Sequence, residues 1–197
     1  MSSFRCEQVW KTSGCSDMVS APDWQCLEHS AAIGRSQLIT KDHNVLLSMT
    51  RSEDVAVRWS VASSVFAPPA VLALLIHDSQ ACVRYAVATN QKSPDFLLEC
   101  LIGDFEDLAC CLAVASNPVI GMEIQNLLAH HPAWQVRRTI AESQRVLADS
   151  VQLILAQDPK LDVRYMLASR SDTTPEVKHL LNQDPDPTIN ELVNSRS

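Results

Sequence analysis

The stretch Val83–Asn90, VRYAVATN, decides the fold because five other segments of the chain share its pattern. The other copies are VRWSVASS from Val57, CCLAVASN from Cys110, VRRTIAES from Val136, VRYMLASR from Val163 and INELVNSR from Ile189. Successive copies begin 26 or 27 residues apart. Self-similarity at one fixed period of this size is typical of repeat proteins.

Each repeat has a second half with its own apolar pattern. An apolar residue stands four positions before a final leucine, and another stands directly before that leucine, a spacing that predicts one buried helical face. The three members of each set are Val71, Leu74 and Leu75; Leu97, Cys100 and Leu101; Ile124, Leu127 and Leu128; Val151, Ile154 and Leu155; Val177, Leu180 and Leu181. Pro69 and Pro175 lie where a helix would begin, a position that tolerates proline.

Helices of about eight residues are too short to be stable alone in water, so neighbouring repeats must cover their apolar faces. The sequence therefore predicts an all-α fold, a right-handed α-solenoid of about six short two-helix repeats with no β-sheet. Residues 1–26 do not match the repeat and are predicted to form an N-terminal cap. Residues 27–197 are predicted to form one elongated solenoid, whose first, degenerate unit begins at LEHSAA, Leu27–Ala32.

Composition narrows the class of protein. The chain has 197 residues, of which 46% are hydrophobic, and no apolar run is long enough to span a membrane. The first residues lack the apolar stretch of a signal peptide, so we expect a cytoplasmic protein whose seven cysteines are mostly reduced thiols. The net charge of −7 argues against a nucleic-acid partner, because contact with phosphates needs a positive surface.

Aspartate and arginine recur together at the repeat junctions. Asp78 lies six residues before Arg84, and Asp158 lies six before Arg164. We expect each aspartate to cap free N–H groups at a helix start, and each arginine to meet the aspartate of its own or the next repeat. Cys111 replaces the arginine in one repeat and Asn190 in the last, so this ladder should be interrupted there.

The pattern D-x4-V-R followed by alternating alanine and valine resembles the HEAT repeat, an armadillo-like helical repeat. The short period and the spacing VR-x2-VA-x-N-x3-P are still more similar to the leucine-rich-repeat variants. This resemblance covers about Arg51–Arg196. It implies a helical scaffold whose first helices line a concave groove. HEAT-like arrays include DNA-binding and DNA-repair modules, and this function is the alternative to a protein-binding scaffold.

Cys6, Cys15, Cys26 and His29 are a candidate metal-binding set in the N-terminal region. Three thiolates and an imidazole could hold a tetrahedral zinc ion. Some leucine-rich-repeat-variant relatives carry an iron–sulfur segment ahead of the repeats, but such a cluster normally needs four thiolates and this region has three. His29 also matches the repeat position of Trp59, which gives it a plain structural explanation. We therefore expect no cofactor, and keep a metal- or redox-sensing adaptor as a weaker alternative.

Other cysteines and histidines have structural explanations. Cys100 and Cys110 occupy positions that are leucine or valine elsewhere, so we expect both to fill the core. Cys111 stands in an arginine position and should be more exposed. His130 and His131 adjoin Pro132, and we interpret them as surface or capping residues. No catalytic sequence motif occurs, so we do not expect an enzyme.

A row of larger side chains is predicted on the first helices, opposite their core-facing residues. At about 100° per residue, Trp59 lies roughly 160° from Val61 on a helical wheel. The equivalent positions hold Tyr85, Leu112, Arg138, Tyr165 and Glu191. Aromatic residues and arginine are enriched at binding hot spots, so Trp59, Tyr85, Arg138 and Tyr165 are predicted to bind a protein or peptide. The alternative is that these rings pack over the neighbouring repeat. Neither the partner nor the oligomeric state can be read from the residues.

Overall fold

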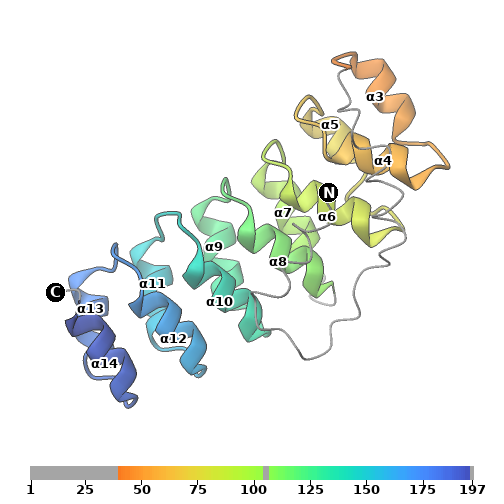
Figure 1. The fold of residues 1–197 in the computed structure, drawn as a ribbon. Helices are drawn as coiled ribbons and strands as arrows, with labels where there is room; N and C mark the ends of the chain where they lie inside the picture. The colour runs from red at the N-terminus through yellow and green to blue at the C-terminus, as the bar shows by residue number, and fades with distance from the viewer. Residues whose placement is uncertain (1–39, 104–106, 196–197) are drawn as a thin grey trace, which may run out of the picture. The chain divides into compact units, whose positions relative to one another are not determined.

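A computed structural model describes residues 40–103 and 107–195, and all regular secondary structure in these two ranges is α-helical (Figure 1). The predicted all-α fold is therefore confirmed for the described part of the chain. Contacts divide the chain into two compact units, Met1–Lys92 and Ser93–Ser197, which we describe one at a time. The predicted cap at residues 1–26 and the degenerate repeat at Leu27–Ala32 lie outside the described residues.

The described part of the first unit contains four short helices. These are α3 (His43–Met49), α4 (Val55–Ala62), α5 (Pro69–Leu72) and α6 (Ala81–Thr89). The Asp42 carboxylate accepts hydrogen bonds from the first N–H groups of α3, and Asp54 does the same for α4. Proline begins α5, as predicted from Pro69. Helices α4 and α6 pack side by side, and Val61 and Val87, at equivalent positions in their C-terminal halves, are completely buried.

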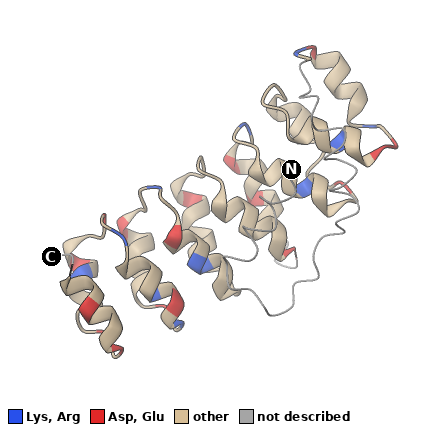
Figure 2. Cartoon of the chain, in the orientation of Figure 1, with Lys and Arg blue, Asp and Glu red and all other residues tan. Residues whose placement is uncertain are grey.

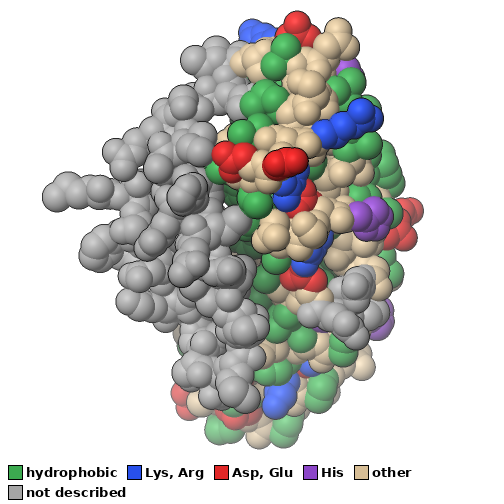
Figure 3. Space-filling view, turned by 90° about the vertical axis from the view of Figure 1, so that its right-hand side faces the viewer, with side chains coloured by type: hydrophobic (Ala, Val, Ile, Leu, Met, Phe, Trp, Pro, Cys, Tyr) green, Lys and Arg blue, Asp and Glu red, His purple; other side chains and the backbone are tan. Residues whose placement is uncertain are grey.

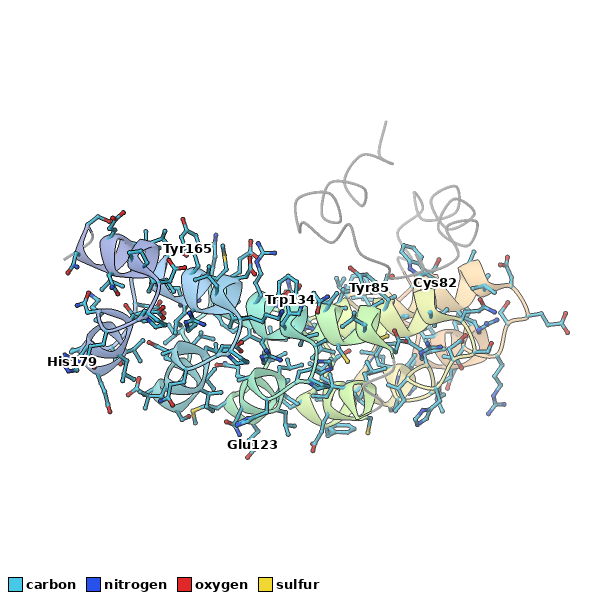
Figure 4. All side chains as sticks on the ribbon, turned by 90° about the horizontal axis from the view of Figure 1, so that it is seen from below. Cys82, Tyr85, Glu123, Trp134, Tyr165 and His179 are labelled. Atoms are coloured by element: carbon cyan, nitrogen blue, oxygen red, sulfur yellow. The ribbon has the colours of Figure 1, made fainter. Side chains whose placement is uncertain are left out.

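The second unit contains eight described helices in two layers. They are α7 (Asp95–Ile102), α8 (Leu108–Ser116), α9 (Met122–Ala129), α10 (Trp134–Glu142), α11 (Asp149–Ala156), α12 (Leu161–Ala168), α13 (Pro175–Leu181) and α14 (Pro187–Asn194). Helices α8, α10, α12 and α14 pack in chain order and form the first-helix layer. Helices α7, α9, α11 and α13 pack in the same order and form the second-helix layer (Figure 4).

The core of the second unit lies between these layers. On α10 the buried residues include Val136, Ile140 and Ala141, which recur at the spacing of one helical face. The second-helix layer contributes the predicted pairs Leu97 and Leu101, Ile124 and Leu128, Val151 and Leu155, and Val177 and Leu181. Each helix has only seven to nine residues, so burial against its neighbours stabilises it more than its own hydrogen bonds do.

One part of the predicted core was wrong. The residue directly before each final leucine is not fully buried, and Leu74 and Leu127 are 53% and 43% exposed. On α7, α9 and α11 the helix is buried instead through the residue that follows the first apolar position: Leu98, Gln125 and Gln152. If the first apolar position is called i, the buried residues of these helices fall at i, i+1, i+4 and i+5. Their centre lies at about 70° on the helical wheel, and position i+3 lies about 130° away from that centre. Cys100 occupies this outward position, so it is exposed and does not fill the core.

Side chains also join successive first helices at their C-terminal ends. The Asn90 side-chain amide donates to the carbonyl oxygens of Ala62 and Ser64, at 2.7 and 3.0 Å. In the second unit, Arg145 donates to the carbonyls of Ala115 and Asn117. Arg170 donates to the carbonyl of Ala141, and so the last carbonyls of these helices gain partners that the helix itself cannot supply.

Arg145 is buried at this edge, with an environment unusual for a guanidinium. Burial and the charge of Arg170 lower the pKa of Arg145 to about 10. Its Nε and Nη1 atoms are buried and have no hydrogen-bond partner among the described residues. Arg145 therefore joins the helix ends, but removing its charged guanidinium from water opposes folding.

Candidate binding surface

Among the described residues, three arginine–aspartate pairs join neighbouring repeats, and we call them the ladder. Arg58 pairs with Asp78, Arg137 with Asp158, and Arg164 with Asp184. In each pair the arginine Nε lies 2.5 to 2.6 Å from one carboxylate oxygen, and Nη2 lies 3.0 to 3.1 Å from the other. The aspartate always belongs to the junction after the arginine's own repeat. These are bidentate, largely buried ion pairs, which fix geometry better than a single contact.

The same arginines also contact the junction before their own helix. Nη1 of Arg58 donates to the Ser52 carbonyl, Nη1 of Arg137 to the His131 carbonyl, and Nη1 of Arg164 to the Asp158 carbonyl, at 2.7 to 2.8 Å. Arg84 makes the equivalent contact with the Asp78 carbonyl. Each of the three ladder arginines therefore connects two successive junctions, one through a backbone carbonyl and one through a carboxylate.

The aspartates have a second structural role. Asp78, Asp158 and Asp184 each accept the backbone N–H of the residue two positions later, at 2.8 to 2.9 Å. Burial raises the pKa of Asp78, but the hydrogen bonds from Arg58 and Gln80 outweigh it, and the net pKa falls below 3.8. The pKa of Asp184 is lowered in the same way by Arg164 and Asp186. These aspartates shape the turn ahead of a first helix and are not themselves the helix N-caps.

One junction has different chemistry at both ladder positions. Cys111 occupies the arginine position and His131 the aspartate position. Cys111 was predicted to be more exposed but is completely buried, because its position faces the adjoining repeat as the ladder arginines do. His131 was predicted as a surface or capping residue and is also buried.

His131 retains the turn contact of the aspartates. Its Nδ1 accepts the Ala133 N–H at 3.0 Å, which assigns the proton of the neutral ring to Nε2. Burial lowers the pKa of His131 below its usual 6.5, and the charge of Arg137 lowers it further. This junction therefore keeps the shaped turn but has no guanidinium–carboxylate pair at its ladder positions.

The predicted binding residues of the first unit lie on two packed helices. Trp59 is on α4 and Tyr85 is on α6, at equivalent positions of successive repeats. Both are half-buried, and the contact between α4 and α6 brings the two helices side by side. Part of each ring therefore covers the helix pair and part remains accessible.

The predicted binding residues of the second unit, Arg138 and Tyr165, lie on α10 and α12, which also pack together. Tyr165 is 40% exposed, whereas Arg138 is half-buried and has Nη2 3.7 Å from a carboxylate oxygen of Glu142. Two residues that the sequence reasoning missed lie one helical turn earlier: Trp134 before Arg138, and Leu161 before Tyr165. The i, i+4 spacing along each first helix indicates both residues.

We call Trp134, Arg138, Leu161 and Tyr165 the first-helix surface. Figure 4 shows Trp134 and Tyr165 on one side of the second unit, with Glu123 and His179 on the opposite side. Leu161 is 40% exposed, like Tyr165. The first-helix surface thus combines two aromatic rings, one aliphatic side chain and one arginine.

The metal candidates Cys6, Cys15, Cys26 and His29 lie outside the described residues. Within residues 40–103 and 107–195, no group of three histidine, cysteine, aspartate or glutamate side chains is arranged to hold a metal ion. No helix in those ranges has the length and apolar composition needed to cross a bilayer.

Comparisons with known proteins support the repeat class. No protein-family profile matches the sequence, and no curated protein does. The fold is similar to that of a solved structure described as a leucine-rich repeat variant with a novel repetitive protein structural motif. The TM-score is 0.58 and the sequence identity 27%, over 78% of this chain. The chain covers 61% of that protein, about three fifths of its length. The predicted likeness to the leucine-rich-repeat variants is thereby confirmed.

Proposed function

We propose that this chain is a non-enzymatic repeat scaffold that binds a protein or peptide partner through the first-helix surface. The observation that carries this proposal is the exposure of Leu161 and Tyr165, each 40%, on a helix that packs against α10 with Trp134 and Arg138. Tryptophan, tyrosine and arginine are enriched among the residues that dominate the energetics of protein interfaces. Trp59 and Tyr85 would contribute in the same way within the first unit.

The ladder geometry disfavours the nucleic-acid alternative. The arginines that recur in the sequence pattern, including Arg58, Arg137 and Arg164, are paired with aspartates and largely buried. Their charge is neutralised within the protein, so they do not supply the positive surface that phosphate binding requires. A cytoplasmic location fits the proposal, because repeat scaffolds with reduced thiols suit that compartment.

The test is a double substitution on the first-helix surface, Leu161→Ala with Tyr165→Ala. Bound proteins would be identified by cross-linking in the source cell with wild type and variant. We expect specific partners to be lost while the melting temperature falls only slightly, because both side chains are partly exposed. Val146→Ala, at an exposed position in the loop between α10 and α11, is the matched control and should keep those partners.

Two outcomes would contradict the proposal. If the double variant keeps every partner and its stability, the first-helix surface is not a binding site. If it keeps every partner but melts at a much lower temperature, the rings serve to cover the helix layer, which is the structural alternative.

A further inference from the structure

The exposed side of the second-helix layer carries an apolar row that the fold does not require. The row consists of one residue from each helix of the layer in the second unit, at a constant step of 26 or 27 residues: Cys100, Leu127, Ile154 and Leu180. Cys100 and Leu127 are exposed, and Ile154 and Leu180 are half-buried. Met122, at the start of α9, is also exposed, at 66%. Apolar side chains repeated in register on a surface indicate an interaction site.

Acidic residues accompany the row. Five are exposed on the four helices, against one lysine, Lys178, and no arginine; these acids are Asp95, Glu99, Glu123, Asp149 and Glu176 (Figure 2). Glu123 precedes Leu127 by four residues and lies on the same helix face. On the face drawn in Figure 3, hydrophobic side chains lie among charges of both signs. The row differs in that its own helices carry almost only negative charge.

We propose that this second-helix row binds a basic amphipathic helix of another protein. The apolar row would receive the apolar face of that helix, and the carboxylates of Glu123 and Glu176, each one turn before a row residue, would meet lysine or arginine beside that face. An anionic membrane surface or a nucleic acid carries the wrong charge for this site. The inference concerns the layer opposite the first-helix surface and is independent of the function proposed for that surface.

The repeat spacing sets the pattern that the bound helix should have. Packed helices lie about 8–10 Å apart, so the row presents one apolar side chain at about that interval. A helix rises about 1.5 Å per residue, so seven residues span roughly 10.5 Å. A bound helix lying along the row would therefore place one apolar residue per heptad against each successive repeat.

The test uses a labelled synthetic helix with leucine once per heptad and lysine on both flanks. Binding to the full-length protein would be followed by fluorescence anisotropy at low and high salt. The control peptide has the same composition with the leucines moved to different faces. We expect saturable binding of the heptad peptide alone, weakened by salt because the flanking contacts are exposed charges. Leu127→Asp should weaken binding by about tenfold or more, and Glu123→Lys by a smaller factor.

Controls separate the row from general effects. Val146→Asp introduces the same charge at an exposed loop position and should leave binding unchanged, as should Tyr165→Ala on the first-helix surface. Thermal melting of each variant would establish that it is folded. Equal binding of both peptides, or full binding by folded Leu127→Asp, would overturn the proposal. A dimer in sedimentation that Leu127→Asp dissociates would also overturn it, because a second copy of this chain would then occupy the row.

Discussion

Two adjacent junctions of the second unit differ in their ladder residues but support the same backbone arrangement. Between α10 and the turn before α12, Arg137 and Asp158 form a bidentate ion pair with oxygens 2.5 and 3.0 Å from the guanidinium nitrogens. Between α8 and the turn before α10, the corresponding positions hold Cys111 and His131. In both turns the second side chain accepts the N–H two residues later.

This difference separates two roles that the ladder combines. The turn needs an acceptor for one backbone N–H, and either a carboxylate or an imidazole nitrogen can provide it. The ion pair connects one repeat to the next, and the stacking of α8 against α10 does not require it. Apolar burial therefore determines the fold, and the ion pairs adjust how firmly each repeat is joined to its neighbour.

The largest effect should come from breaking an existing pair. Asp158→Ala would leave the buried guanidinium of Arg137 without its carboxylate and remove the acceptor of the Lys160 N–H. We expect a loss of about 3–5 kcal/mol in the free energy of unfolding, measured in urea. Glu142→Ala is the matched control, because it removes a more exposed carboxylate that pairs with Arg138, and should cost less than about 1 kcal/mol. Equal losses in the two variants would show that the ladder does not couple the repeats.

The next-largest effect should come from replacing Cys111 and His131 with the arginine and aspartate that the other ladder junctions have. Cys111→Arg alone buries a charge, and His131→Asp alone buries a carboxylate without a ladder arginine in the preceding repeat, so each should destabilise the protein. The double variant should recover part of both losses, with a coupling energy of about 1–3 kcal/mol in a double-mutant cycle. Strictly additive losses would mean that the two positions do not face each other as the other ladder pairs do.

A smaller effect is expected in the last repeat, where the residue at the arginine position makes only the contact with the backbone carbonyl. Asn190 stands in the last arginine position, and its side-chain amide donates to the Asp184 carbonyl at 3.2 Å. Asn190→Ala removes this one hydrogen bond and should cost about 0.5–1.5 kcal/mol in thermal or urea unfolding. A loss as large as that of Asp158→Ala would show that the carbonyl contact, and not the ion pair, carries most of the coupling.

The smallest effect should be a pH dependence confined to the unusual junction. Because burial lowers the pKa of His131 in the folded protein, the unfolded chain takes up this proton first as the pH falls. The stability contributed by neutral His131 is full above pH 6.5 and decreases as the pH falls through 6.5 toward the lower pKa of the folded protein. His131→Asn keeps an acceptor for the Ala133 N–H but does not titrate. The stability curves of wild type and variant should therefore diverge below pH 6.5, and parallel curves would contradict this assignment.

Much of the architecture could be predicted because it depends on local periodicity. Val136 and Ile140 are four residues apart in a segment that recurs six times, and only stacked helices bury such short faces. The orientation of the second helices was harder to predict. On the helical wheel of α9, Leu127 and Gln125 lie on opposite sides of the buried residues Ile124 and Leu128. Hydropathy favours burial of Leu127, but the structure buries Gln125. Tertiary packing decides between two such faces, and the sequence of one helix does not contain that information.

The ladder was only partly predictable for a related reason. The six-residue step from Asp158 to Arg164 is visible in the sequence, and it corresponds to the contact between the arginine and the aspartate's carbonyl. The carboxylate contact spans 20 residues, from Arg164 to Asp184, and depends on how one repeat stacks on the next. The predicted binding residues had a similar limit: Trp59, Tyr85, Arg138 and Tyr165 follow from position alone, but packing sets how far the neighbouring helix covers each side chain. Their role in binding stays a prediction.

The two contacts of Asp158 also bear on how the second unit comes apart. Its carboxylate holds Arg137 and its carbonyl holds Arg164, so α10, α12 and the turn between them are joined through one residue. In a linear array, cooperativity extends only as far as each interface is strong. The helices from α10 to α14 should then open as one block in native-state hydrogen exchange, while the block boundary falls at the Cys111–His131 junction. One cysteine and one histidine would thus set the size of the unit that unfolds together.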